Sequence, residues 1–144
     1  MCEMIFLDTN VLSEVMHPAP NATVVEWLDR QDPAELLLSA VTVAEIWYGV
    51  HRLSDGKRKA NLLKITHSLF EEEFAQRILP FDEAAAIHYA ELVCQREQLG
   101  RPISMADAQI ASICRCVDGA SLATRNVRDF TGIGLALVNP WEAI

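Results

Sequence analysis

The sequence predicts an α/β protein in which a mostly parallel sheet of four to five strands is covered by helices on both faces, giving three α/β/α layers. Short apolar runs, such as residues 4–7 and 36–38, alternate with longer segments of helical periodicity. These runs are continuously apolar, as expected of strands buried on both faces. The 144 residues suit one compact domain, 1–144, and no repeat or long linker divides them.

In the first half of the chain, residues that start and stop helices separate the elements. In order, we expect a strand at residues 4–7, helices over 11–16 and after 21, a strand at 36–39, a helix over 42–53, and a further helix that includes residues 62–70 and ends near residue 73. Pro18 and Pro20 end the first helix, and the Asn21 side chain caps the second. Thr42 opens the third helix, because a threonine before an apolar-periodic segment favours an N-cap.

The second half of the chain continues the alternation. In order, we expect a strand at residues 78–81, helices over 83–99 and 104–117, and strands at 121–124 and 135–138, the last at an edge of the sheet. Asp82 caps the long helix, which ends at Gly100, and Ser104 opens the next helix. Right-handed crossovers bring the carboxyl ends of the parallel strands to one edge, where ligands bind in such sheets.

The composition narrows the class of protein. A hydrophobic content of 51% is enough for a sizeable core, and the net charge of −8 is unlike that of a passive nucleic-acid binder. No apolar run approaches the ~20 residues needed to cross a bilayer. Glu3, and no basic residue, precedes the first apolar run, which argues against a signal peptide. We therefore expect a cytoplasmic protein with no membrane partner.

Acidic or amide side chains occur at four places near the ends of predicted strands or the starts of predicted helices. They are Asp8, Glu45, Asp107, and Asn126 together with Asp129. A capping role competes with a ligand role for three of them. Asp8 either caps the next helix or holds a cation, and Thr42-x-x-Glu45 and Ser104-x-x-Asp107 both fit the capping-box pattern. Asp129, taken alone, fits a solvated loop acid equally well.

Taken together, the same residues indicate a metal site. Carboxylates brought to one sheet edge repel one another, and no Lys or Arg lies beside Asp8, Glu45 or Asp107 in the sequence to compensate. Oxygen-only ligands favour Mg²⁺, or alternatively Mn²⁺, over zinc. Neutral oxygens that would support the carboxylates come from Thr9, Asn10, Thr124 and Asn126.

These residues resemble the motifs of the PIN-domain ribonucleases. The matching segments are Leu7-Asp8-Thr9-Asn10, Ala44-Glu45, Ala106-Asp107 and Thr124-Arg125-Asn126 with Asp129-Phe130. The chain is most similar to the VapC toxins of type II toxin–antitoxin systems, and among them to the FitB-like branch. That branch is also matched by residues 10–14 and 77–82 and by the ending Asn139-Pro140-Trp141. The resemblance covers nearly the whole chain.

The resemblance implies a metal-dependent endoribonuclease that cleaves single-stranded or loop RNA. It places Asp8 and Asp107 as direct Mg²⁺ ligands and Glu45 as a ligand acting through water. Some relatives have Asp at the position of Asn126, so the fourth catalytic residue is open between Asn126 and Asp129, as is the number of metal ions. Arg125 or the basic residues between 52 and 64 would hold flanking phosphates.

The resemblance also implies protein partners. It predicts a homodimer and a cognate VapB-like antitoxin whose C-terminal tail lies across the active site, with operator DNA bound only through the antitoxin. A net charge of −8 suits a basic tail. Trp47 and Tyr48 would serve either a groove for this partner or the core.

Two other classes of protein stay open at this point. A haloacid-dehalogenase-like phosphatase also begins with a strand that ends in Asp, but it needs a second Asp two positions later, where this chain has Asn10. A non-catalytic protein-interaction module with a PIN-like fold would share the overall pattern. Such a module would have lost its activity, and the presence of all three acids, Asp8, Glu45 and Asp107, argues against that.

Overall fold

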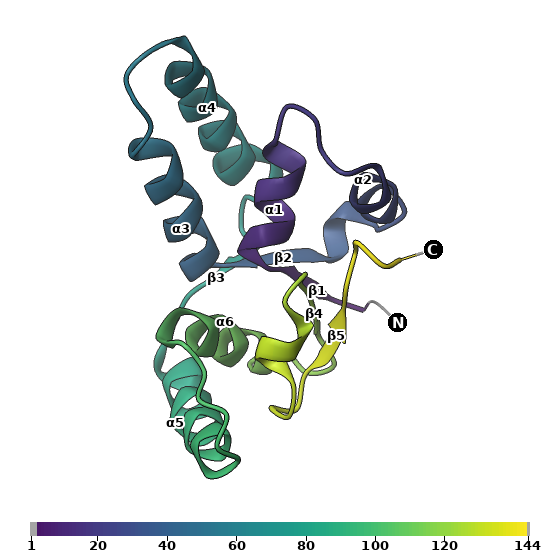
Figure 1. Ribbon diagram of the computed structural model, residues 1–144, viewed down its shortest axis with the longest axis vertical. Coiled ribbons are helices and arrows are strands. Elements are labelled where there is room, and N and C mark those ends of the chain that lie inside the picture. Colours follow the sequence, from purple (N-terminus) through teal and green to yellow (C-terminus); the bar gives the residue numbers. More distant parts are fainter. Residues whose placement is uncertain (1–2, 144) are drawn as a thin grey trace.

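A computed structural model describes residues 3–143 and shows three layers, with a central sheet between two groups of helices (Figure 1). The sheet has five strands in the order β3-β2-β1-β4-β5, and every pairing between neighbours is parallel. The strands are β1 (Ile5–Leu7), β2 (Leu36–Ser39), β3 (Ile78–Leu79), β4 (Ser121–Ala123) and β5 (Ala136–Val138). The expected α/β/α class is confirmed, and β5 does form an edge.

Six α-helices connect these strands within residues 3–143. They are α1 (Thr9–Met16), α2 (Ala22–Asp29), α3 (Ala40–His51), α4 (Lys57–Ser68), α5 (Glu83–Gln98) and α6 (Met105–Arg115). Shorter turns are η1 (Pro33–Glu35), the π-helical η2 (Leu69–Glu73) that prolongs α4, and the 3₁₀ turn η3 (Val127–Phe130). Among residues 3–143, none of these helices combines the length and the apolar character that a membrane crossing requires.

Two hydrophobic clusters form the core, one on each face of the sheet. Successive strand side chains point to opposite faces, so Phe6 belongs to the cluster with α5 and α6, whereas Leu7 packs with α1, α2 and α3. Leu37 and Leu38 divide between the two clusters in the same way. Burial on both faces explains why the strands read as continuous apolar runs.

Two helix starts differ from the sequence-based prediction. Helix α1 begins at Thr9 with Asp8 as its N-cap, two residues earlier than expected. Helix α3 begins at Ala40, because the Ser39 hydroxyl at the end of β2 accepts a hydrogen bond from the Thr42 amide. Thr42 is therefore inside the helix and does not cap it. Asn21, Asp82 and Ser104 cap α2, α5 and α6 as predicted.

Candidate active site

Asp8 stands at the carboxyl end of β1, in the middle of the sheet, and its side chain is 4% exposed. One carboxylate oxygen accepts a hydrogen bond from the Thr9 amide at 2.8 Å. The other accepts from the Thr124 hydroxyl at 2.7 Å and from the Asn10 side-chain amide at 3.3 Å. Thr124 follows β4, the neighbour of β1, so the parallel sheet itself brings these two residues together. The hydrogen bonds to this carboxylate therefore come from α1 and from the residue that follows β4.

Glu45 is connected to Asp8 through Thr9. The Thr9 hydroxyl donates to the Glu45 carboxylate at 2.6 Å and lies 3.1 Å from the Thr42 hydroxyl. Because α3 starts at Ala40, Glu45 lies in its second turn, and the expected capping box from Thr42 to Glu45 is wrong. The acid is exposed and free of a capping role, and its contact is with the helix that Asp8 caps.

Asp107 lies in the first turn of α6 and is half-buried. Its amide donates to the Ser104 hydroxyl at 3.2 Å, so the predicted Ser104 cap is present. The supports of the Asp107 carboxylate are fewer than those of Asp8.

Asn126 and Asp129 are exposed residues of the loop that follows β4. The Asn126 amide donates to the Thr124 hydroxyl at 3.0 Å, which ties this loop to the group that holds Asp8. The Arg125 amide donates to the Asn10 side-chain oxygen at 3.2 Å. Asp129 does not line the cleft that contains the other predicted site residues, although its charge acts on Asp107.

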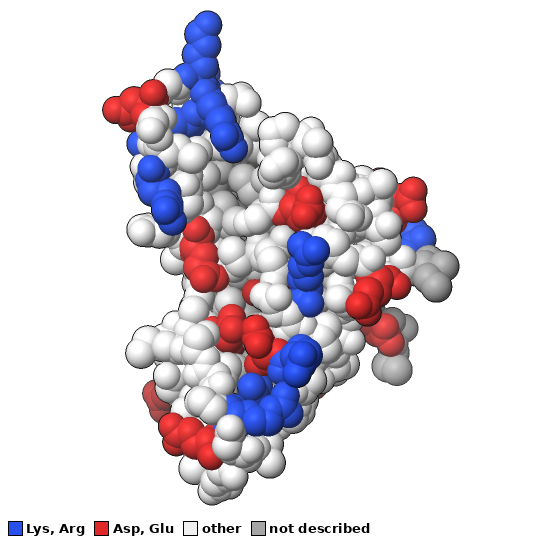
Figure 2. Space-filling model, in the orientation of Figure 1, with Lys and Arg blue, Asp and Glu red and all other residues white. Residues whose placement is uncertain are grey.

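A cleft of about 480 Å³ collects these side chains. Its walls are formed by Asp8, Thr9, Asn10, Ser13, Glu14, His17, Glu45, Asp107, Arg125, Asn126 and Trp141. Figure 2 shows acidic side chains gathered in the hollow between the α3–α4 region and the α5–α6 region, with basic side chains beside them. Four of the five predicted catalytic positions, and two of the three predicted supporting residues, thus share one cleft.

The two aspartates affect each other's ionisation. Burial, in the main, raises the pKa of Asp8, and the charges of Asp107 and Glu45 raise it further, against the hydrogen bonds from Thr124 and Thr9. Burial also raises the pKa of Asp107, and the Asp129 and Glu45 charges add to this, against the effects of Ser104 and Arg96. The cleft therefore disfavours the charged form of both carboxylates unless a cation compensates.

The donor set of the cleft fits a hard divalent cation. All the acids supply oxygen, and the buried carboxylate of Asp8 faces the same space as Asp107. Among residues 3–143, no three His, Cys, Asp or Glu side chains lie close enough together to ligate one ion directly. Mg²⁺ suits such a site, because it is usually bound by one or two carboxylates and keeps several waters.

The structure also shows two residues near the site whose contacts the sequence did not predict. Arg96, at the end of α5, is 4% exposed, and its Nη1 donates to the Asp129 carbonyl at 2.7 Å and the Thr131 carbonyl at 3.2 Å. Its Nε donates to the Arg101 carbonyl at 2.7 Å, so it joins α5 to the loop before α6 and to the η3 segment. Trp141 lies against Arg125, and the only sequence signal for it was the ending Asn139-Pro140-Trp141.

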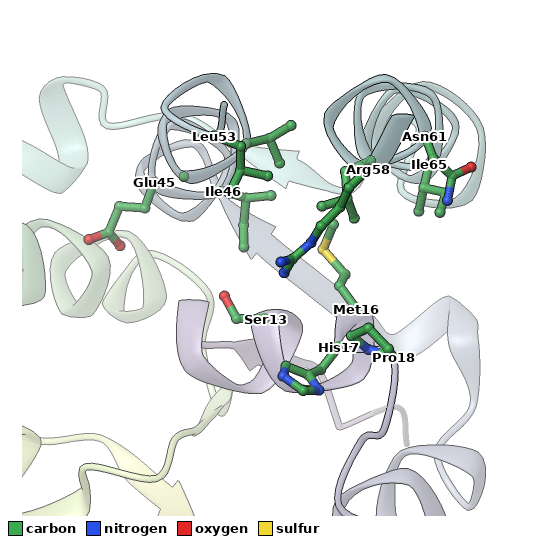
Figure 3. A pocket seen from close by; sticks show the side chains of 13 residues that line it. Ser13, Met16, His17, Pro18, Glu45, Ile46, Leu53, Arg58, Asn61 and Ile65 are labelled. Atoms are coloured by element: carbon green, nitrogen blue, oxygen red, sulfur yellow. The ribbon is translucent and has the colours of Figure 1, made fainter. Parts of the chain in front are cut away.

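A second cavity adjoins the cleft between α1, α3 and α4 (Figure 3). It measures about 440 Å³, and its apolar lining includes Met16, Ile46 and Ile65. Ser13, His17 and Glu45 line both cavities, so the two adjoin along these residues. We call this second cavity the apolar groove, and neither Trp47 nor Tyr48 lines it. Trp47 packs against the core and Phe70, whereas Tyr48 is 68% exposed.

Comparison with known proteins gives the family. Residues 5–133 match the family described as PIN domain. This chain belongs to the PIN-domain family. It is 41% identical to Toxin FitB of Neisseria gonorrhoeae, over 96% of this chain and 99% of that protein. It is 39% identical to VapC ribonuclease Y4jK of Sinorhizobium fredii, again over 96% of this chain and 99% of that protein.

The structural comparison agrees with this assignment. A chain from the structure of FitAB bound to the IR36 DNA fragment superposes with a TM-score of 0.93 and is 40% identical, covering 98% of each chain. The expected resemblance to VapC toxins and their FitB-like branch is confirmed. This PIN domain is therefore a VapC-type protein, and the phosphatase alternative has no support.

Proposed function

We propose that this PIN domain is a Mg²⁺-dependent endoribonuclease and the toxin of a type II toxin–antitoxin pair. The observation that carries the proposal is the cleft that the buried Asp8 carboxylate shares with Asp107 and Glu45. These three acids come from three helices, and within residues 3–143 none of them forms an ion pair with a basic residue. The names of the relatives, Toxin FitB and VapC ribonuclease, support this activity. Mn²⁺ has the same ligand preference and is the alternative ion.

Asp8 and Asp107 would bind the ion, and Glu45 would act through a water. When bound, Mg²⁺ lowers the pKa of a water and neutralises charge that develops on the phosphate. The hydrogen bonds from Thr124, Asn10 and Thr9 fix the Asp8 oxygens in one orientation. One Glu45 oxygen is held by the Thr9 hydroxyl, and the other makes no hydrogen bond within the described residues, which leaves it to orient the attacking water.

The reaction is the hydrolysis of an RNA phosphodiester bond. A water adds to phosphorus, the bond to the 3′ oxygen breaks, and the products carry a 5′-phosphate and a 3′-hydroxyl. The 2′-hydroxyl of the RNA does not act as the nucleophile. Asn126 is our candidate for the fourth polar contact, because it lines the cleft, and Asp129 would act at longer range through its charge on Asp107.

A VapB-like antitoxin is the proposed partner, with operator DNA bound through it. The structure of a similar chain in FitAB bound to DNA supports this. The apolar groove leads directly into the acidic cleft, which suits a tail with an apolar segment followed by a basic residue. We also expect a homodimer, which light scattering of the purified protein tests.

The activity is tested by incubating total cellular RNA with purified, antitoxin-free protein. We expect discrete cuts with Mg²⁺, and their loss with a chelator, with Asp8→Asn and with Asp107→Asn. The new ends should accept ligation as 5′-phosphates, and a cyclic phosphate would refute the mechanism. Absence of cleavage together with absence of Mg²⁺ binding by calorimetry would favour a non-catalytic interaction module.

A further inference from the structure

Arg125 is a cation in an acidic cleft that pairs with none of the acids there. It lines the cleft together with Asp8, Glu45 and Asp107, and its backbone amide is bonded to Asn10. Among residues 3–143, its guanidinium takes part in no ion pair and no hydrogen bond. Its five N–H donors are therefore available to an anion that enters the cleft.

Trp141 holds this guanidinium in place. The Arg125 Cζ lies 5.0 Å from the centre of the Trp141 ring, in cation–π geometry. The ring itself is fixed, because the Trp141 amide donates to the Asn139 side chain at 3.0 Å, Pro140 is buried, and the indole packs against the core cluster on the α1 face. A fixed aromatic ring lowers the number of positions that an exposed arginine can take.

The arginine is also linked to the proposed metal ligand. Asn10 donates through its side-chain nitrogen to Asp8 and accepts through its side-chain oxygen from the Arg125 amide. One amide side chain therefore sets the distance between the Asp8 carboxylate and the backbone of Arg125. An anion bound by Arg125 would lie at a fixed offset from the ion held by Asp8.

We propose that Arg125 and Trp141 form a subsite for a backbone phosphate next to the scissile phosphate of a single-stranded RNA, with Trp141 acting as a positioning residue. The inference rests on the proposed ribonuclease function. A guanidinium suits phosphate, because its planar set of donors can bind two phosphate oxygens at once. Within residues 3–143, Arg125 is the only Lys or Arg in the lining of the acidic cleft.

The basic residues between 52 and 64 fit this role less well. Lys59 is paired with Asp55 at 3.3 Å, and Arg58 reaches over the apolar groove between α1 and α4 (Figure 3). Neither residue lines the acidic cleft. The sequence left Arg125 and this basic segment open as alternatives, and the geometry points to Arg125.

The experiment measures binding of a fluorescein-labelled, 12-nucleotide single-stranded RNA of mixed sequence by anisotropy, with Mg²⁺ at several salt concentrations. All proteins carry Asp107→Asn, which prevents cleavage and leaves the Asn10–Arg125 contact intact. We expect Arg125→Gln to weaken binding about tenfold, as loss of a charged hydrogen bond does. The slope of log Kd against log salt should fall by about 0.7, the value for one phosphate contact on a single strand.

Arg128→Gln is the matched control, because it removes the same charge from the same loop outside the cleft lining. We expect its Kd and slope to stay within about twofold and ~0.2 of the parent protein, since one exposed charge outside the cleft lining adds little under salt screening. Equal effects of Arg125→Gln and Arg128→Gln would overturn the subsite and leave the ribonuclease proposal standing. Failure of both this parent protein and the unsubstituted protein to bind the RNA would overturn both proposals.

The positioning role of Trp141 is tested by asking whether the effect of its substitution on RNA binding requires Arg125. Trp141→Leu should weaken binding about two- to fivefold, the range of an exposed cation–π contact, and keep the salt slope because the charge remains. Trp141→Phe should restore most of the affinity. In the Arg125→Gln protein, Trp141→Leu should have no further effect, whereas additive losses would show direct stacking on RNA and overturn the positioning role. Unchanged RNA binding with weakened antitoxin binding would instead assign the pair to the protein partner.

Discussion

The two aspartates of the cleft are supported in different ways. On the β1–β4 side, Asp8 is buried and accepts hydrogen bonds from Thr9, Asn10 and Thr124. On the α6–η3 side, Asp107 is half-buried. The η3 segment beside it is bound by Arg96, which donates hydrogen bonds to the Asp129 and Thr131 carbonyls. Residues at the start of α1 and directly after β4 bind the first acid directly. The segments beside the second acid are joined by Arg96, which lies outside the cleft lining.

This difference follows from where each residue lies in the fold. Adjacent parallel strands carry Asp8 and Thr124 to the same edge, so no further device is needed to bring them together. Asp107 lies in the first turn of α6, after the loop at residues 99–104, and η3 belongs to another loop. These loops are not positioned by strand pairing, so they need hydrogen bonds of their own. Arg96 donates three, to the carbonyl oxygens of Arg101, Asp129 and Thr131.

The largest expected effect is that of Arg96→Met. The substitution leaves three carbonyl groups without their donor, at a cost of about 1 kcal/mol or more each, so the free energy of unfolding should fall by about 2–4 kcal/mol. Urea denaturation measures this loss. Arg128→Met, an exposed arginine in η3, should change stability by less than about 0.5 kcal/mol. Equal stability of the two variants would mean that the α6–η3 loops do not depend on Arg96.

The next effect concerns the hydroxyl that holds Asp8. Thr124→Val removes the 2.7 Å hydrogen bond and keeps the shape, so Mg²⁺ affinity and cleavage should fall about 10–100-fold, as loss of a supporting contact to a ligand does. Thr124→Ser should retain most activity. Ser104→Ala, which removes the hydroxyl bonded to the Asp107 amide on the other side, should cost less. If Ser104→Ala lowered Mg²⁺ affinity and cleavage more than Thr124→Val does, the site would depend more on the support of Asp107 than on that of Asp8.

The sequence predicted the β1–β4 side well and the rest of the site only in part. The apolar runs and the acid, hydroxyl and amide after the first strand located β1 and Asp8, because strand periodicity and strand-end chemistry are local signals. The start of α3 was predicted wrongly. Ser39-x-x-Thr42 and Thr42-x-x-Glu45 are both plausible caps. The hydrogen bond from the Thr42 amide to the Ser39 hydroxyl decides between them, and it depends on where β2 ends.

The contacts of Arg96 and Trp141 could not be predicted from local patterns. Arg96 bonds to carbonyls 33 and 35 residues away, and Trp141 meets Arg125 only because β5 lies beside β4. Backbone carbonyls carry no sequence signal, so an arginine that binds them looks like any helix-end arginine. Such long-range contacts depend on the assembled sheet rather than on spacing.

A smaller effect on activity is expected when the hydrogen bond between Thr9 and Glu45 is removed. Thr9→Val removes the hydroxyl that donates to the Glu45 carboxylate at 2.6 Å, while the Thr9 amide still binds Asp8. We expect kcat to fall about three- to tenfold, because a net hydrogen bond contributes about 1 kcal/mol. Mg²⁺ affinity should change little, since the Asp8 contacts remain. Thr9→Ser should act like the parent protein, and a loss of Mg²⁺ affinity as large as that of Thr124→Val would place Glu45 among the direct ligands.

The smallest effect is a gain of stability on the α6–η3 side. Burial and the neighbouring carboxylates raise the pKa of Asp107 above its ordinary value of 3.8. Between 3.8 and the raised pKa, the folded protein holds a proton that the unfolded chain has lost, so stability falls as pH rises through this window. Asp107→Asn mimics the protonated acid and should raise Tm by a few degrees at pH 7, but not below pH 3.8. Mg²⁺ should raise the Tm of the unsubstituted protein and remove most of this advantage. Asp118→Asn is the control, because Asp118 is exposed, lies outside the cleft lining and does not contribute to the raised pKa of Asp107. An equal gain from it would mean that general negative charge, rather than the site, limits stability.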